Sequence, residues 1–130
     1  NYINKLNINY LHVFSYSNRT GTVASELTNQ VPKTEKINRS RSLNRLSNHM
    51  RLDFYKKNIN TVRKVLFESK IDDDYIVGFT DNYIRVVVKG NIKMLKKIYN
   101  VKLSFIGDDK VYGELYWKID RLLALQVILV

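Results

Sequence analysis

The sequence predicts a mixed α and β protein with a buried strand, a long basic helix and a small five-stranded antiparallel β-barrel of the OB-like kind. Three observations predict it. An apolar run near the start ends in a polar loop, a long stretch without Gly follows Pro32, and five short runs rich in β-branched and aromatic residues come after Asn58. A length of 130 residues suits one ordinary domain, or a very small domain with an appendage.

The first predicted element is a buried strand over Leu6–Tyr16. The polar run Ser15–Thr22 follows it, and polar residues just past the carboxyl end of a strand are typical of ligand-facing loops in α/β barrels. His12 lies within the apolar run, which favours a packed core histidine over a catalytic one. Arg19 has two interpretations, an anion clamp or an ordinary exposed loop arginine. Residues 23–31 are expected to form a loose connector.

The second element is a helix from Pro32 to Lys57. Pro is tolerated at a helix start, and the segment has no further Pro and no Gly. One apolar stripe with helical spacing runs along it, formed by Leu43, Leu46, Met50 and Phe54. Such a helix would be roughly 35–40 Å long. Helices that bind calmodulin or lie on a membrane surface have similar composition, so the helix alone does not decide its partner.

The charge is concentrated in one segment. The chain carries a net charge of +10, and residues 32–64 alone hold ten Lys or Arg against Glu35 and Asp53. A concentrated basic segment predicts a polyanionic partner, either nucleic acid or an anionic membrane, bound in a salt-dependent way. The alternative is a solvated helix face.

The barrel is expected from five short strands in about 55 residues, since closure removes the exposed edges of so small a sheet. The predicted strands are Val62–Phe67, Tyr75–Phe79, Tyr83–Val88, Ile98–Ile106 and Lys110–Tyr116.

The second and third of these strands are expected to form a hairpin, with Gly78 and Asp81-Asn82 supplying the turn. Its loop would present Phe79 and Tyr83 beside Arg85, as small barrels that grip unpaired nucleic acid do. Of the two rings, Tyr83 is expected nearer the core and Phe79 nearer the loop. The alternative is an ordinary hairpin whose rings fill the core.

Several kinds of site are excluded or disfavoured. The chain has no Cys, which excludes disulfides and thiolate-bound clusters, and its two histidines, His12 and His49, lie on unrelated segments. The acidic run Asp72–Asp74 lacks the spacing of a calcium loop and is interpreted as a solvated turn. No window reaches 18 apolar residues, so no membrane span is expected.

The chain begins without Met, which suggests a fragment. Residues 117–130 form an apolar tail without a functional assignment, for which packing on a neighbouring domain is one interpretation.

Four blocks in order resemble the C-terminal part of radical-SAM methylthiotransferases, and most closely the subgroup that acts on threonylcarbamoyladenosine at position 37 of tRNA. The blocks are LHVFSYSNRTGT at Leu11–Thr22, NQVP at Asn29–Pro32, RSRSL at Arg39–Leu43 and GFTDNYIRV at Gly78–Val86. The resemblance extends from about residue 6 to residue 115. No single block would be enough to support the resemblance.

The resemblance implies that residues 1–31 are the end of a radical-SAM partial barrel, including one remnant strand. Residues 32–58 would be a basic linker helix and residues 59–116 a TRAM-like barrel. The parent enzyme would be cytoplasmic and would use 4Fe-4S clusters and S-adenosylmethionine. This chain lacks the cysteines for those clusters, so no cofactor, metal or catalytic residue is assigned to it. It should be inactive alone.

The function expected from the sequence is tRNA binding, with the barrel and helix positioning the anticodon loop for chemistry on the missing N-terminal and radical-SAM portions. The alternative is a protein- or membrane-surface interaction module built on the basic helix and the aliphatic tail. The resemblance adds a candidate substrate- or cofactor-facing loop, formed by Tyr16, Ser17, Arg19 and Thr22. The expected RNA-binding residues are Arg39, Arg41, Arg45, Arg51, Lys56, Lys57, Arg63, Lys64, Phe79, Tyr83, Arg85 and Lys89.

Overall fold

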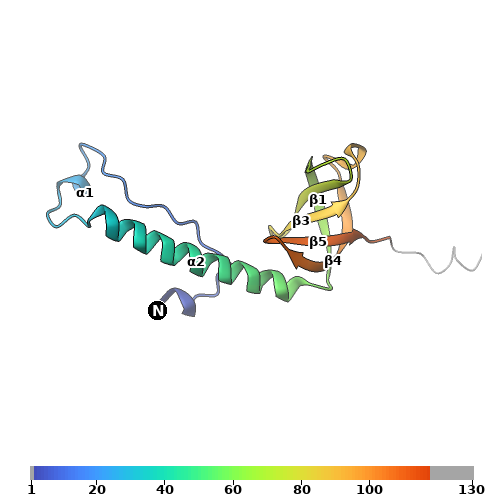
Figure 1. Cartoon of the computed structure of the whole chain (residues 1–130), viewed down its shortest axis with the longest axis horizontal. Coiled ribbons are helices and arrows are strands. Elements are labelled where there is room, and N and C mark those ends of the chain that lie inside the picture. The colour runs from blue at the N-terminus through green and yellow to red at the C-terminus, as the bar shows by residue number, and fades with distance from the viewer. Residues whose placement is uncertain (1, 118–130) are drawn as a thin grey trace, which may run out of the picture. The chain divides into compact units, whose positions relative to one another are not determined.

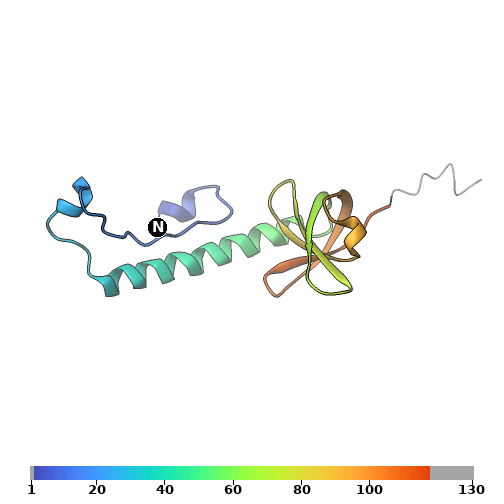
Figure 2. The same cartoon turned by 90° about the horizontal axis from the view of Figure 1, so that it is seen from above.

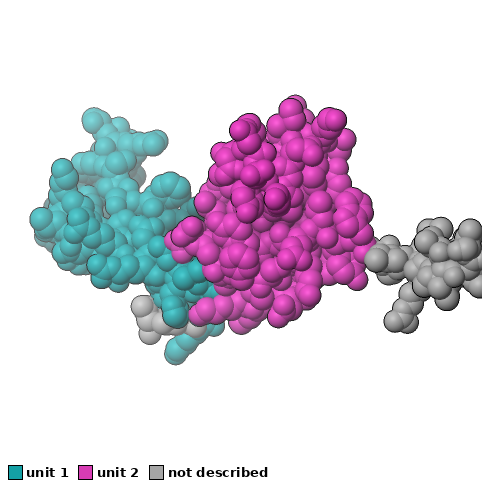
Figure 3. Space-filling view, turned by 45° about the vertical axis from the view of Figure 1, so that its right-hand side comes forward, with its two compact units in different colours: residues 1–54 teal, residues 55–130 magenta. Residues whose placement is uncertain are grey.

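A computed structural model describes residues 2–117 of the chain (Figure 1). The chain divides into two compact units, residues 1–54 and residues 55–130, which Figure 3 colours separately. The boundary falls inside the long helix α2 (Lys33–Asn58), so the last turn of that helix belongs to the second unit.

The first unit is built around most of α2. A short 3-10 helix (Tyr2–Lys5) opens the chain, and a one-turn helix α1 (Val23–Glu26) lies within the predicted connector. The expected helix is confirmed, because α2 begins directly after Pro32 and the amide of Lys36 donates to the Pro32 carbonyl at 3.1 Å. The side chains of the predicted apolar stripe are half-buried.

The buried strand predicted over Leu6–Tyr16 is wrong. That segment is an extended chain without strand pairing, and most of its side chains are exposed. It lies along α2 (Figures 1 and 2) and is fastened by Ser47, whose hydroxyl accepts from the Leu11 amide at 2.8 Å and donates to the Leu11 carbonyl at 3.0 Å. A strand needs a neighbouring strand for its backbone hydrogen bonds, and within residues 2–117 none pairs with this segment.

The second unit is a closed five-stranded barrel, as expected (Figure 2). Its elements are β1 (Val62–Lys70), β2 (Tyr75–Thr80), β3 (Arg85–Lys89), a 3-10 turn (Ile92–Met94), β4 (Ile98–Gly107) and β5 (Lys110–Leu115). Around the ring the strands follow the order β1-β2-β3-β5-β4, and β4 pairs back with β1.

Strand pairing is mixed rather than purely antiparallel. Four of the pairs are antiparallel, and β3 runs parallel to β5, with Val87 opposite Tyr112. The reason is geometric, because a closed ring with an odd number of strands cannot alternate direction all the way round. One parallel pair is therefore required, and the crossover from β3 through the 3-10 turn to β4 places it between β3 and β5.

The core is almost entirely aliphatic. Nine of its side chains are fully buried: Val65, Phe67, Ile76, Ile84, Val86, Val87, Val101, Leu103 and Val111. The last turn of α2 contributes Tyr55, which is 4% exposed. The helix ends just beyond it, where Asn60 adopts a positive φ of 66° that terminates the helical path.

Gly78 does not lie in the turn predicted for it. It lies inside β2 opposite Phe67, while the hairpin turn is made by Asp81, Asn82 and Tyr83. A β-carbon at Gly78 would fall on the carbonyl oxygen of Leu66 in β1. The absence of a side chain thus permits the close approach of β1 and β2.

We expect Gly78→Ala to destabilise the barrel by about 2–3 kcal/mol, because the obstructing atoms are backbone and cannot rotate away. Gly90→Ala is the matched control, since the atoms nearest to its β-carbon belong to the side chains of Ile76 and Met94 and not to the backbone. Urea unfolding followed by circular dichroism measures both. Equal destabilisation of the two variants would contradict this account of Gly78.

Candidate nucleic-acid interface

The outer face of the β2–β3 hairpin carries two aromatic–cation pairs. Phe79 lies opposite Arg85 and Tyr75 lies opposite Lys89 in the strand register, and all four side chains are exposed. Between the two pairs, Val77 and Val87 face each other and are 5% and 2% exposed. Directly opposite residues of an antiparallel pair have neighbouring side chains, so each ring stands beside a cation.

The Phe79–Arg85 pair continues into an apolar row across the next strands. Leu66 of β1 is opposite Phe79, and Ile98 of β4 is opposite Leu66. Phe79, Leu66 and Ile98 are 38%, 40% and 63% exposed. Exposed rings flanked by cations are what unpaired bases and their phosphates require, so this surface has the chemistry of a nucleic-acid interface.

The structure corrects the expected placement of the Tyr83 ring. Tyr83 is not in the core but 72% exposed in the turn, where it has a positive φ of 64°. Phe79 is the penultimate residue of β2, consistent with the predicted strand Tyr75–Phe79, and its side chain is exposed. The inward position expected for Tyr83 is taken by Ile84, which is fully buried. Tyr83 lies in the turn between β2 and β3, so its side chain does not follow the alternation of either strand.

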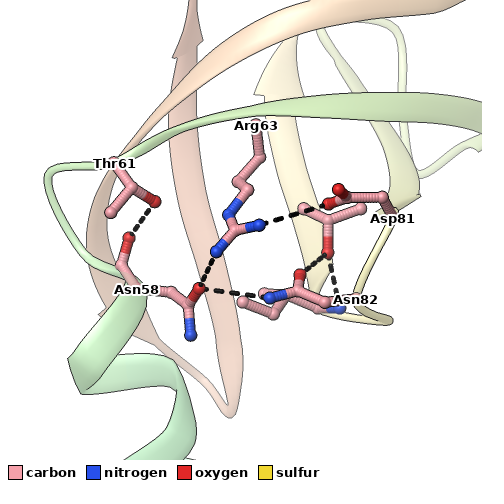
Figure 4. Close-up of polar contacts among 7 residues, drawn as sticks. Asn58, Thr61, Arg63, Asp81 and Asn82 are labelled. Carbon is pink, nitrogen blue, oxygen red and sulfur yellow. Dashed lines mark hydrogen bonds and ion pairs between the residues drawn. The ribbon is translucent and has the colours of Figure 1, made fainter.

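A polar network centred on Asn58 joins the last residue of α2 to the hairpin turn (Figure 4). The Asn58 Oδ1 atom accepts from Arg63 Nη2 at 3.0 Å and from Asn82 Nδ2 at 3.2 Å, and Asn58 is 5% exposed. Arg63 also lies 3.7 Å from the carboxylate of Asp81.

The Thr80 side chain stabilises the turn by two hydrogen bonds. Its hydroxyl accepts from the Ile84 amide at 2.8 Å and donates to Asn82 Oδ1 at 2.6 Å. Arg63, expected from the sequence to bind RNA, is thus placed where it also stabilises the turn.

The remaining expected barrel cations are exposed to solvent. Lys64 lies on the outer face of β1, opposite Asn100, and Lys89 ends β3. Lys96 and Lys97 follow the 3-10 turn and are exposed as well. Cations in such positions are suited to phosphate oxygens.

The cations of α2 differ in their surroundings. Arg41, Arg45, Lys56 and Lys57 are exposed, and Arg39 pairs with Glu35 at 2.7 Å one turn earlier. Arg51 is half-buried. An exposed ion pair such as Arg39–Glu35 contributes little to stability. Lys56 and Lys57 lie in the last turn of α2, where their positive charges interact favourably with the negative end of the helix dipole.

The candidate loop of the first unit borders a pocket of about 320 Å³ between residues 13–16 and the start of α2. The Tyr16 ring lies 4.9 Å from Lys36 Nζ, and the Thr22 hydroxyl donates to the Arg19 carbonyl at 2.9 Å. Ser17 and Arg19 are exposed. The structure therefore places Tyr16 at the pocket and the other three in the exposed loop that follows.

His12 is exposed, not packed in a core, because the strand expected around it does not form; its ring meets Tyr10 edge-on at 5.2 Å. His49 lies on α2, 3.3 Å from Asp53. In the acidic turn, Asp72 accepts from the amides of Asp74 and Tyr75, as a turn carboxylate does. Within residues 2–117, no group of three or more His, Cys, Asp or Glu side chains is placed to hold a metal ion.

Sequence reasoning missed Tyr75, Leu66 and Ile98 as members of this surface. Strand alternation identifies which residues share a face, but it does not say which strand lies beside which. Only the observed register brings Leu66 and Ile98 alongside Phe79.

Taken together, the second unit is a small closed barrel with an exposed aromatic and basic face, the kind of face on which some other small barrels stack unpaired bases. No known family model matches the chain. Among individual proteins, the chain is 36% identical over 111 residues to the threonylcarbamoyladenosine tRNA methylthiotransferase MtaB of Bacillus subtilis, covering 82% of the chain and 25% of that protein.

Two further relatives are tRNA-2-methylthio-N(6)-dimethylallyladenosine synthases. That of Buchnera aphidicola subsp. Schizaphis graminum is 32% identical over 117 residues, covering 88% of the chain and 27% of the relative. The synthase of Carboxydothermus hydrogenoformans is 32% identical over 104 residues, covering 78% of the chain and 24% of the relative. The chain spans about a quarter of the length of these curated relatives. The relatives are tRNA methylthiotransferases, which supports the family expected from the sequence.

None of the helices in the part of the chain that the structure describes is both long enough and apolar enough to cross a membrane.

We expect Asn58→Ala to destabilise the protein by about 1–3 kcal/mol, because it removes the acceptor shared by Arg63 and Asn82 in a nearly buried site. Asn58→Asp is the matched control, since a carboxylate retains the acceptor and faces a guanidinium. Thermal unfolding of both variants measures the difference. An Asp variant as unstable as the Ala variant would contradict the role assigned to the Asn58 acceptor.

Proposed function

We propose that this chain is the tRNA-binding portion of a radical-SAM tRNA methylthiotransferase, in which the barrel and the basic helix position the anticodon loop. The observation that carries the proposal is the presence of two aromatic–cation pairs on the β2–β3 face, in a chain whose relatives are tRNA methylthiotransferases. The barrel would then be the TRAM-like domain that the resemblance implies.

The two parts of the interface would contribute different energies. The cations of residues 32–64 contact phosphates, which gives affinity without sequence preference and makes that affinity fall steeply with salt. The rings on the barrel stack on unpaired bases, at about 1–3 kcal/mol for each base. A folded RNA with an exposed loop, such as an anticodon stem-loop, offers both kinds of contact.

The methylthiolation chemistry would reside on polypeptide outside this chain. Iron–sulfur clusters are held by Cys thiolates, and none of the 130 residues is Cys. The residues present therefore do not fit a 4Fe-4S cluster, and we assign no chemical step to them. On this proposal the chain binds and orients the substrate for a radical-SAM portion that carries the clusters and S-adenosylmethionine.

Threonylcarbamoyladenosine 37 is the nucleoside that we propose for the parent enzyme, with C2 as the methylthiolated atom. The Bacillus subtilis relative is named for that nucleoside and is 36% identical to the chain, whereas the two dimethylallyladenosine enzymes are 32% identical. The proposal also implies a cytoplasmic enzyme, since tRNA modification takes place on a cytoplasmic substrate.

The first unit fits the same proposal. The segment 6–16 presents exposed apolar side chains and a backbone outside any strand pairing, which is the condition of a barrel strand separated from its neighbours. We propose that residues 1–31 complete the radical-SAM partial barrel of the parent enzyme, with Tyr16, Ser17, Arg19 and Thr22 in a loop that faces its substrate or cofactor.

The competing interpretation is a protein- or membrane-surface module. Titrating the chain with an anticodon stem-loop RNA and with anionic vesicles, each at two salt concentrations, separates the two. Binding to vesicles that depends on residues 119–130, without binding to RNA, would overturn the proposal. Those residues lie outside the part of the chain that the structure describes.

The phosphate contacts are tested by the double variant Arg41→Glu, Arg45→Glu, which reverses two exposed cations of α2. We expect weaker binding to the anticodon stem-loop and a salt slope reduced by about 1 for each phosphate that is no longer neutralised. The control is Lys5→Glu, Lys70→Glu, which changes the net charge equally outside the 32–64 segment. The same weakening in both double variants would show a response to net charge and not a phosphate site.

The base contacts are tested by Phe79→Ala. We expect RNA binding to weaken by about 1–3 kcal/mol, because the ring is the centre of the exposed row and stands beside Arg85. Phe105→Ala is the control: Phe105 is 57% exposed but stacks on Tyr112 at 4.9 Å, with no cation opposite it. Fluorescence titration with labelled RNA measures both, and the proposal fails if the control variant binds as weakly as Phe79→Ala.

A further inference from the structure

Six non-Gly residues of the described chain have a positive φ: Asn29, Asn60, Tyr83, Lys96, Asp108 and Asp109. Four of the six are Asn or Asp, whose short polar side chains tolerate this conformation best after Gly. Tyr83 and Lys96 are the exceptions, with φ values of 64° and 59°. Both side chains are exposed.

The conformation of Tyr83 is imposed by its surroundings. Its amide donates to the Thr80 carbonyl at 3.0 Å, and the Thr80 amide donates to the Ile84 carbonyl at 3.0 Å. The Thr80 hydroxyl and the Asn58 network hold the other residues of the turn. The turn thus fixes the backbone of Tyr83 while leaving its side chain 72% exposed.

The conformation of Lys96 is imposed by a strand irregularity. Its amide donates to the carbonyl of Phe67 at 2.7 Å, and the Phe67 amide donates to the Lys97 carbonyl at 3.2 Å. Phe67 is fully buried and sits at the register shift between β1 and β2. The backbone of Lys96 therefore cannot relax without disturbing the core, yet its side chain is exposed to solvent.

Neither side chain offsets the backbone strain by packing. An exposed Tyr or Lys buries little, and Asn or Gly at the same position would adopt the positive φ at lower cost. Elsewhere the chain does use Asn or Asp for this conformation. The residue types at these two positions are therefore explained by what the side chains contact outside the barrel.

We propose that Tyr83 and Lys96 are RNA contacts held on strained backbone, with the Tyr83 ring stacking on an unpaired base and the Lys96 ammonium pairing with a phosphate. The inference rests on the proposed function. It adds Lys96 as a contact, and it gives Tyr83, which the sequence already suggested as an RNA-binding residue, an argument from backbone conformation. Asp81 lies in the same turn, and its negative charge would repel a phosphate. The guanidinium of Arg63, 3.7 Å from the Asp81 carboxylate, reduces that repulsion.

The test of Tyr83 compares Tyr83→Asn with Tyr83→Phe in the full 130-residue chain. We expect Tyr83→Asn to bind an anticodon stem-loop RNA about tenfold more weakly, with a melting temperature equal to or a few degrees above that of the unmodified chain. Tyr83→Phe should retain the affinity, because it keeps a stacking ring. The salt dependence of binding should be the same for all three proteins.

The test of Lys96 uses Lys96→Asn and Lys96→Arg. We expect Lys96→Asn to reduce the salt slope of RNA binding by about 1 without lowering the melting temperature. Lys96→Arg retains the charge and should keep the slope. The two positions are thus distinguished by different readouts, stacking for one and salt dependence for the other.

The outcomes separate this inference from the proposed function. If the unmodified chain does not bind the RNA at low salt, the proposed function fails and the inference with it. If the unmodified chain binds and both Asn variants bind equally well with the same slope, the inference alone is overturned. Weaker binding by Tyr83→Asn that is matched by Tyr83→Phe, or that accompanies a fall in melting temperature, would also overturn it, because the fold and not the ring would then be responsible.

Discussion

Closure of a ring with five strands is the constraint on which the second unit depends. Closure leaves no unpaired edge in a sheet this small, and because five is odd it requires the one parallel pair, between β3 and β5. Within the ring, β1 and β2 approach so closely at position 78 that any side chain there would displace the backbone of Leu66, and Gly has none. The inward side chains then fill the barrel, and the alternate side chains are left outside.

Side chains of a barrel that point outward and remain exposed do not contribute to its packing, so their chemical character is informative about what they bind. Two strands present rings beside cations, and the row through Phe79 continues over Leu66 to Ile98. Apolar exposure in register across three strands has no packing benefit for an isolated barrel, whereas it suits the flat faces of bases. The basic segment supplies the complementary, less specific attraction to phosphates.

The polar network at Asn58 shows how the interface and the fold share residues. Asn58 ends α2 and is nearly buried, and through Arg63 and Asn82 it determines the conformation of the β2–β3 turn. A buried amide that satisfies two donors leaves little freedom to the backbone it holds. The turn can therefore maintain Tyr83 in a conformation that an aromatic residue seldom adopts.

Local pattern in the sequence was enough to predict the long helix, the five strands and the closed barrel, because spacing and residue type report which face of each element is apolar. The likeness to tRNA methylthiotransferases was likewise readable from short ordered blocks. Neighbouring segments decided the rest. The run Leu6–Tyr16 is as apolar as a strand but has nothing to pair with in the described residues, and the odd number of strands in the ring requires a parallel pair. Tyr83 belongs to the turn and not to β3, and its side chain is exposed. Register, closure and backbone conformation depend on contacts between residues far apart in the chain, and a linear pattern contains no information about which of those contacts form.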